Sequence, residues 1–391
     1  MPIADDMTPM PDRTSTAQVL VVTATVGSGH NSVARAIIAA LHNRAPQVRV
    51  ECVDALTFAP KLFRLQYAGG FALGMTRAPR TYGLAFRLTN RPHGPHRGLF
   101  ERVRLRYERY VLRRFRQFLS ANRFDLIVHT HFLSPPQVAH FAGSGMFHTP
   151  QWVAVTDIET HRFWYSEGVE QWFVPVDYTA GLLRRWGIPA ERITVSGMPI
   201  HPKWHEPVDR ERVLADWRLP RDRRIVLLSG GTEFTCGPIV KIARRIVSEC
   251  RDAYVVVLAG RNKKLLARLA SMPESPERLL GVSFTDRVHE LVEVCSLMVT
   301  KAGGITTAEC LAKGTPMVLM KPVPGHEAGN ARYLAERGVA RIAERAGRAP
   351  EEVCRLLANA SELARLSEGA RSLSRDGASL IAEAICRRIG Q

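Results

Sequence analysis

Two side chains in the N-terminal half are suited to acid–base chemistry, and each follows an apolar run of the chain. The turn Gly27-Ser28-Gly29-His30 comes after the run 19–24 and before a helical stretch at 32–43. Glycine allows a tight turn and the close approach of a ligand. We therefore expect His30 at a helix N-terminus facing a cleft, as a general base with a pKa in the working range. Asp157, directly after the run 151–156, is well placed either for chemistry of its own or for orienting a histidine.

Further histidines and a tryptophan surround these positions in the sequence. His161 and Trp164 follow Asp157, while His129 and His131 end another predicted strand. A metal cluster of the three histidines with Asp157 is an alternative, although the four residues belong to different elements. The carboxylate pair DxD, which commonly holds a nucleotide-bound divalent ion, does not occur. The sequence therefore predicts neither a metal site nor another cofactor.

Two glycine-containing turns in the C-terminal half are typical of phosphate-binding sites. One turn precedes a helical stretch at 239–247, and free backbone N–H groups at such a helix start bind anions. The other turn also joins a strand to a helix, and both suit a nucleotide diphosphate. The P-loop pattern GxxxxGK[ST] is absent, so phosphoryl transfer loses its main support. The two turns contribute Gly230, Gly231, Thr232, Gly303, Gly304, Ile305, Thr306 and Glu309.

A loop rich in proline and glycine follows the second of these turns. Within it, Glu327 and Asn330 offer hydrogen bonds to sugar hydroxyls. Taken alone, Glu327 fits a solvated loop acid better than a ligand-binding residue. Arg261, after another predicted strand, is a candidate for stabilising diphosphate charge.

Short apolar runs that alternate with helical stretches must position these residues. Runs of this kind predict parallel strands that are covered by helices on both faces. The fold class is therefore α/β, with two tandem Rossmann-like domains facing a cleft, because both halves open on a strand, a glycine turn and a helix. The predicted strands are 19–24, 48–54, 125–130, 151–156, 171–175, 193–196, 224–228, 254–259, 282–284, 297–299, 317–320 and 339–342. The helices predicted in the first half are 32–43, 99–122, 135–142 and 178–186.

Proline and charge distribution divide the 391 residues further. We expect a disordered tail at 1–17, an N-terminal domain at 18–198 and a proline-rich linker at 199–223. A nucleotide-binding domain follows at 224–370. The helix at 371–391 is long enough to cross back to the first domain. No secretory or membrane-spanning segment is predicted. Seven cysteines without a CxxC pair argue against a zinc ribbon and a disulfide framework, and favour a reducing cytoplasm.

Positive charge is concentrated between residues 55 and 119. This segment has fourteen basic and two acidic residues, which is twelve of the seventeen net positive charges of the chain. Its aromatic and apolar residues include a set at helical spacing between 99 and 119, beside an apolar, glycine-containing loop. Binding to an anionic membrane surface is our prediction, with a solvated basic face and a nucleic-acid surface as alternatives. The candidate arginines are Arg64, Arg77, Arg80, Arg87, Arg102, Arg106, Arg109 and Arg113.

Together these motifs resemble the monogalactosyldiacylglycerol synthases and the processive diacylglycerol β-glucosyltransferases, which are glycolipid glycosyltransferases of the GT-B fold. The resemblance runs from about residue 19 to about residue 342. It rests on GSGH at 27–30, on TDIETHRFW at 156–164, on SGMPIHPKW at 196–204 and above all on the stretch 300–330. The related peptidoglycan N-acetylglucosaminyltransferase is less similar, because its GGTGGH opening is absent. Two departures from the family pattern are His326, where glutamine is common, and the first donor loop, which carries Phe234 and Cys236.

The resemblance implies a lipid acceptor in the N-terminal domain and a UDP-sugar in the C-terminal domain. His30 or Asp157 would be the catalytic base, and Glu327 would contact the nucleotide ribose. The acceptor side would include the turn Gly27, Ser28 and Gly29 with His161 and Trp164, whereas Gly303, Gly304 and Thr306 would line the diphosphate. The implied partners are a UDP-hexose, diacylglycerol and anionic membrane lipids, without nucleic acid.

The expected activity is inverting transfer of galactose or glucose to the glycerol hydroxyl of diacylglycerol, at the cytoplasmic face of the membrane by a peripheral protein. One alternative is a non-catalytic GT-B protein that senses a UDP-sugar and binds a membrane or partner. Another is a transferase with a different lipid acceptor.

Overall fold

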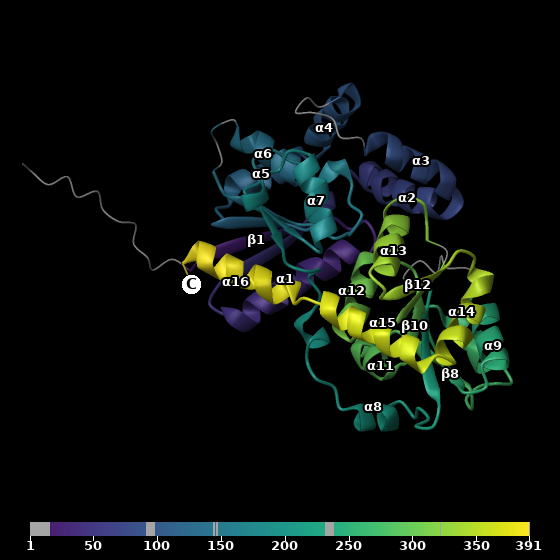
Figure 1. Cartoon of the computed structure of the whole chain (residues 1–391). Coiled ribbons are helices and arrows are strands. Elements are labelled where there is room, and N and C mark those ends of the chain that lie inside the picture. Colours follow the sequence, from purple (N-terminus) through teal and green to yellow (C-terminus); the bar gives the residue numbers. More distant parts are fainter. Residues whose placement is uncertain are drawn as a thin grey trace, which may run out of the picture.

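The computed structural model of the chain describes residues 16–90, 98–143, 145, 148–230, 238–320 and 322–390. Each half builds one six-stranded parallel sheet with helices around it (Figure 1). The order of the N-terminal sheet is β2-β1-β3-β4-β5-β6 and that of the C-terminal sheet is β12-β11-β10-β7-β8-β9. Both are all-parallel, so the predicted α/β class with two Rossmann-like domains is confirmed.

The strands lie within one to three residues of the predicted apolar runs. The inner strands bury their central side chains because helices cover both sheet faces, which is why their sequences are continuous apolar runs rather than alternating ones. The edge strands β2, β6, β9 and β12 are partly exposed. The N-terminal strands are β1 Gln18–Thr23, β2 Arg49–Asp54, β3 Leu126–His129, β4 Gln151–Ala154, β5 Gln171–Val174 and β6 Ile193–Val195. The C-terminal strands are β7 Arg224–Ser229, β8 Ala253–Gly260, β9 Leu279–Ser283, β10 Leu297–Thr300, β11 Met317–Met320 and β12 Ala340–Ala343.

Helices connect the strands in both halves. In the first half these are α1 Gly29–Arg44, α2 Lys61–Arg77, α3 Pro79–Thr89, α4 Leu99–Val111, α5 Arg113–Ala121, α6 Pro135–Ala142 and α7 Asp177–Arg185. Those that follow are α8 Arg210–Asp216, α9 Ile239–Glu249, α10 Lys263–Ala270, α11 Val288–Val294, α12 Gly304–Ala312, α13 His326–Glu336, α14 Ala349–Leu357, α15 Ala360–Leu373 and α16 Gly377–Ile389. The C-terminal helix α16 packs along α1 of the other domain (Figure 1).

The single helix predicted at 99–122 is wrong, because the structure has two helices there. The chain leaves helical geometry at Leu112, which is fully buried. A hydrogen bond from the Phe115 N–H to the carbonyl of Leu112, three residues earlier, forms a tight turn at the junction. After the break, Phe115 and Leu119 of α5 lie in the core beside β1.

The glycine-containing segment before it is also different from the prediction of a loop. It forms the helical hairpin of α2 and α3, in which Pro79 occupies the first turn of α3. Proline is favoured there because the first helical N–H groups have no partner within the helix. In the described part of the chain, no helix is both long and apolar enough to cross a membrane.

The cysteine pattern led to a prediction against disulfides that the structure contradicts at one pair. Cys250, after α9, is bonded to Cys354 in α14, 104 residues away in the sequence. Spacing along the chain could not indicate this pair, because the packing of α9 against α14 brings the two residues together.

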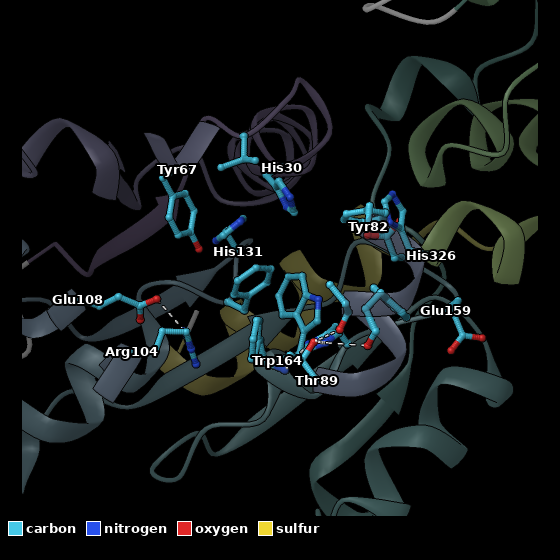
Figure 2. A pocket seen from close by; sticks show the side chains of 17 residues that line it. His30, Tyr67, Tyr82, Thr89, Arg104, Glu108, His131, Glu159, Trp164 and His326 are labelled. Carbon is cyan, nitrogen blue, oxygen red and sulfur yellow. Dashed lines mark hydrogen bonds and ion pairs between the residues drawn. The ribbon is translucent and has the colours of Figure 1, made fainter. Parts of the chain in front are cut away.

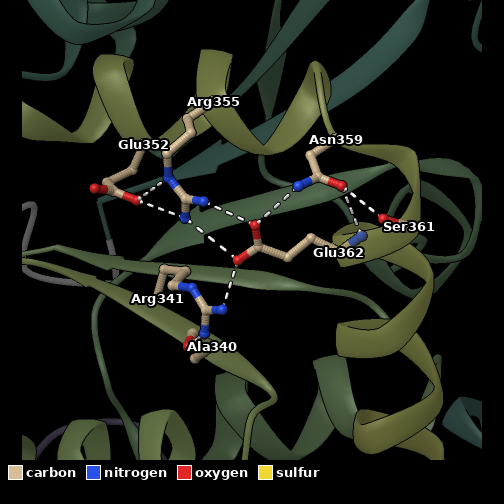
Figure 3. Close-up of polar contacts among 7 residues, drawn as sticks. All are labelled: Ala340, Arg341, Glu352, Arg355, Asn359, Ser361 and Glu362. Carbon is tan, nitrogen blue, oxygen red and sulfur yellow. Dashed lines mark hydrogen bonds and ion pairs between the residues drawn. The ribbon is translucent and has the colours of Figure 1, made fainter.

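A polar network joins α15 to α14 and to β12 (Figure 3). Glu362 of α15 forms ion pairs with Arg341 of β12 and with Arg355 of α14, the latter at 2.7 Å. Asn359 caps α15 by accepting the Glu362 N–H at 3.0 Å. Hydrogen bonding to Arg355 lowers the pKa of Glu362. Because α15 packs on α12, the network holds the helix whose N-terminus faces the other domain.

Candidate active site

A cavity of about 300 Å³ lies at the carboxyl end of the N-terminal sheet. Aromatic side chains form most of its wall, and His30 reaches it from α1 (Figure 2). Asp157, in the loop after β4, also lines it. The α2–α3 hairpin and α4 cover it, and His326 of the C-terminal domain closes one side. The pocket therefore combines an apolar lining with both residues predicted as the base.

The hydrogen bonds of His30 determine which ring nitrogen is available for chemistry. Its Nδ1 lies 2.8 Å from the carbonyl oxygen of Thr130 and 3.1 Å from Oγ1 of Thr156. A carbonyl only accepts, so Nδ1 carries the hydrogen and Nε2 keeps its lone pair. No described residue hydrogen-bonds Nε2. Burial lowers the pKa of His30, and the carboxylate of Asp157 opposes this effect. The imidazole is thus neutral at neutral pH and able to accept a proton.

Asp157 lies where the two domains meet. Its Oδ1 accepts a hydrogen bond of 3.4 Å from the side-chain amide of Asn330, which also donates to the Ala302 carbonyl at 3.0 Å. The Asn330 oxygen in turn accepts the Glu159 N–H at 2.8 Å. Asn330 is fully buried, and its hydrogen bonds to Asp157 and Glu159 join α13 to the loop after β4. Its predicted role with a sugar hydroxyl stays a prediction, and the structure gives it this interdomain role.

The turn that contains Gly303 and Gly304 packs against the same loop. A Cβ atom on Gly304 would lie 2.4 Å from the Thr156 carbonyl oxygen and 3.4 Å from Oδ1 of Asp157. Only glycine allows this approach, which brings the start of α12 next to the candidate base. Ile305 lies beside Gly29, at 3.7 Å from a Cβ built there, so the two predicted turns face each other.

His161 and Trp164 form the pocket wall opposite His30. The centre of the Trp164 ring is 6.3 Å from that of His30. His161 accepts the Phe163 N–H through Nδ1 and therefore donates from Nε2 to Thr89 at 3.0 Å. Burial lowers the pKa of His161 to about 4. Both residues of the predicted acceptor loop thus lie in the pocket.

The alternative metal cluster is not assembled. His129 is hydrogen-bonded to Ser134 and Gln151, and burial lowers its pKa to about 3. His131 accepts the Leu133 N–H. Among the described residues, no group of three metal-ligating side chains has the geometry to hold an ion.

The predicted donor residues occupy different environments. Glu327 is buried and forms an ion pair of 3.0 Å with Lys301, so it is not a solvated loop acid. Burial raises the pKa of Glu309 in α12 to about 8. Arg261 lies 4.4 Å above the ring of Phe284. Thr306 lies in the first turn of α12, and Gly230 follows β7, whereas Gly231 and Thr232 lie outside the described residues.

Several residues of the site carried no chemical signal in the sequence. The Tyr82 hydroxyl lies 2.9 Å from Nδ1 of His326, and a Cβ on Gly83 would lie 2.4 Å from Pro324. These contacts connect α3 with the first residue of α13 and with the loop before it, across more than 240 positions of the chain. Arg104 and Glu108 form an ion pair in the pocket wall, and only their spacing of four in a predicted helix could have suggested it.

The predicted membrane-binding segment presents both apolar and basic side chains to solvent. On α4, Leu99 is 78% exposed and Val103 is 60% exposed, and Tyr107 and Tyr110 are exposed beside them. Six of the eight candidate arginines are exposed, while Arg64 and Arg109 are half-buried. Arg109 contacts His140 and the Leu105 carbonyl.

Solved structures with the same two-domain architecture define the class of the fold. S. aureus MnaA, in a co-structure with UDP, is similar with a TM-score of 0.64 and 14% identity, covering 96% of this chain and 97% of that one. MurG of Acinetobacter baumannii has a TM-score of 0.58 and 14% identity, covering 95% and 100%. The predicted GT-B fold is thereby confirmed.

Family models then match each half of the chain. Residues 30–200 match monogalactosyldiacylglycerol (MGDG) synthase, and residues 226–385 match the glycosyltransferase family 28 C-terminal domain. The processive diacylglycerol beta-glucosyltransferase of Bacillus cytotoxicus is 26% identical over 92% of this chain and 90% of its own length. That of Bacillus licheniformis is 28% identical over 67% and 68%. The predicted resemblance is thereby confirmed: the N-terminal half matches the monogalactosyldiacylglycerol synthase model and the C-terminal half the glycosyltransferase family 28 C-terminal domain.

Proposed function

We propose that the protein transfers galactose or glucose from a UDP-sugar to the glycerol hydroxyl of diacylglycerol, with inversion at the anomeric carbon. The observation that carries the proposal is the position of His30, whose free Nε2 lies in an aromatic pocket. That pocket opens beside the glycine turn at the start of α12. The names of the relatives, which are diacylglycerol glucosyltransferases, and of the matching family model, which is MGDG synthase, supply the substrate class.

In this proposal His30 and Asp157 act together. Nε2 removes the proton of the lipid hydroxyl while its oxygen attacks the anomeric carbon from the face opposite UDP. The imidazolium keeps its Nδ1–H on the Thr130 carbonyl, and the Asp157 carboxylate stabilises its positive charge. His30 is thus the base and Asp157 its electrostatic partner, in the manner of other carboxylate-supported histidines.

The leaving diphosphate receives the electron pair of the broken glycosidic bond. Backbone N–H groups at the start of α12 would stabilise its charge, as helix N-termini do for other phosphates. Gly303, Gly304 and Thr306 would line it, and Arg261 is a further cation on this domain. We further propose that no divalent ion is required, because the sequence lacks a DxD motif.

We infer that the protein acts at the cytoplasmic face of a membrane that contains anionic lipid. The α4 surface supports this, because exposed leucine, valine and tyrosine side chains alternate there with arginine. Apolar side chains enter the lipid boundary while basic ones bind the headgroups. The pocket lies directly behind α4, so a lipid could enter it from the membrane.

The test is a thin-layer assay of the purified protein with diacylglycerol in anionic liposomes and UDP-galactose or UDP-glucose in separate tubes. We expect a new glycolipid with one sugar, and His30→Ala should lower turnover by about 10²–10⁴-fold without abolishing UDP binding. Unchanged turnover would remove His30 from the mechanism. No glycolipid and no lipid-dependent release of UDP, with UDP bound, would refute the proposed activity and favour a sensor.

A further inference from the structure

A buried ion pair lies in the wall of the pocket, apart from the reacting groups. Arg104 and Glu108 are one turn apart in α4, with Nη1 and Oε1 separated by 2.7 Å and side-chain exposures of 13% and 3%. Gln137 donates to the second Glu108 oxygen at 3.3 Å. A buried ion pair usually adds little stability over apolar side chains of the same volume. Its presence among aromatic residues therefore calls for another role.

Arg104 has a hydrogen-bonding group left over at this position. Its Nε is buried and has no partner among the described residues. Its guanidinium carbon lies 4.2 Å above the Phe163 ring, which leaves the donors at the edge of the group. Buried donors are nearly always satisfied in native proteins, and Arg104 is one of the residues that line the cavity. Its Nη2 lies 4.0 Å from the Glu101 carboxylate, which is too far for a hydrogen bond, so this N–H group is the donor that a ligand in the cavity would satisfy.

The charges around Arg104 restrict the kind of acceptor. Glu108 balances its charge, and Glu101 lies 4.0 Å from Nη2. Burial lowers the pKa values of the neighbouring His131 and His161, which are neutral as a result. No net positive charge remains for an anionic group. A neutral oxygen that only accepts hydrogen bonds fits, and in an apolar lipid this is an ester carbonyl.

The position of Arg104 relative to His30 agrees with such a ligand. The His131 ring is 4.4 Å from the His30 ring, and Arg104 is close enough to act on the pKa of His131. In Figure 2 the Arg104–Glu108 pair lies on one side of the pocket and Tyr82 with His326 on the other, with His30 between them. The reactive hydroxyl and the ester carbonyls of diacylglycerol are likewise separated by only a few covalent bonds.

We propose that Arg104 is a positioning and specificity residue that donates a hydrogen bond to an ester carbonyl of the acceptor lipid, with Glu108 as its counter-ion. This rests on the proposed function, because it takes the pocket as the acceptor site. The consequence is selection for diacylglycerols over dialkylglycerols, whose ether oxygens are poorer acceptors. A site built around a hydrogen bond rejects the analogue that cannot make it.

The test compares short-chain diacylglycerol and dialkylglycerol of equal chain length in two measurements, calorimetric binding and glycolipid synthesis. The variant is Arg104→Met with Glu108→Gln, which removes both charges together and leaves no buried carboxylate unpaired. The matched control is Glu108→Gln alone. It keeps the Arg104 guanidinium, and the side-chain amide of the new glutamine still offers Arg104 a carbonyl oxygen. Thermal unfolding establishes that each variant is folded.

We expect the wild type and the control to prefer diacylglycerol by at least about tenfold, and the double variant by less than about twofold. Dialkylglycerol should bind the wild type and the double variant about equally well, which a general structural defect would not produce. Equal binding of both lipids by the wild type, or full preference in the double variant, would overturn the proposal. Selective binding without any glycolipid would support Arg104 and refute the transfer activity instead.

Discussion

Replacing Gly304 by alanine should open the cleft without unfolding either domain. The added Cβ would lie 2.4 Å from the Thr156 carbonyl oxygen, whereas such contacts essentially never fall below 3.0 Å. The two backbones must therefore separate by at least 0.6 Å, the difference of these values. Both belong to well-packed elements, so the domains themselves have to move apart.

The expected cost to catalysis follows from this displacement. A misplacement of about 1 Å between reacting groups lowers rates by about 10²-fold, which is about 2.7 kcal/mol in the barrier. Alanine is a better helix former than glycine by about 1 kcal/mol, so the thermal unfolding midpoint should not fall. The assays are kcat/KM for glycolipid synthesis, UDP binding by calorimetry, and thermal unfolding.

The matched control is Gly347→Ala, because a Cβ at Gly347 has no neighbour within 4 Å. We expect its activity to equal that of the wild type, and Gly304→Ala to keep UDP binding within a few-fold. Wild-type activity in Gly304→Ala would refute the requirement for this close approach. Loss of folding in Gly304→Ala would show that the contact is needed for stability rather than for domain closure.

Three further predictions concern the base, the interdomain contact and the membrane surface. Burial lowers the pKa of His30, so kcat/KM should fall with decreasing pH only below 6.5. The Asp157 carboxylate partly raises this pKa again, so Asp157→Asn should move the acid limb of the pH–rate profile to lower pH. An acid limb that does not move would contradict this coupling. Tyr82→Phe removes the hydroxyl contact with His326 and should lower kcat/KM by roughly fivefold, or about 1 kcal/mol, with little change in thermal stability; equal kinetics would show that the contact is not needed. Leu99→Ser with Val103→Ser should weaken binding to anionic vesicles by about 2 kcal/mol, or roughly thirtyfold, in a sedimentation assay, while activity on detergent-dispersed lipid is retained; unchanged sedimentation would place the membrane contact elsewhere.

The sequence alone determined the strands and the class of the fold. Short apolar runs such as 19–24 and 317–320 predict strands buried on both faces, and each is followed by a glycine-containing turn and a helix. Because parallel strands place their carboxyl ends on one edge, His30 and Asp157 were predicted in one cleft from local pattern. These features depend on neighbours in the chain, which periodicity records.

Only the tertiary structure decided how the site works. The contact of Asn330 with Asp157 spans 173 positions and that of Tyr82 with His326 spans 244, so no local pattern could indicate either. The same holds for the Thr130 carbonyl that fixes the tautomer of His30. The break at Leu112 also depends on tertiary packing, because Phe115 and Leu119 beyond the break pack into the core beside β1. Packing between distant segments, rather than propensity, supplied these features and gave the pocket its Arg104–Glu108 wall.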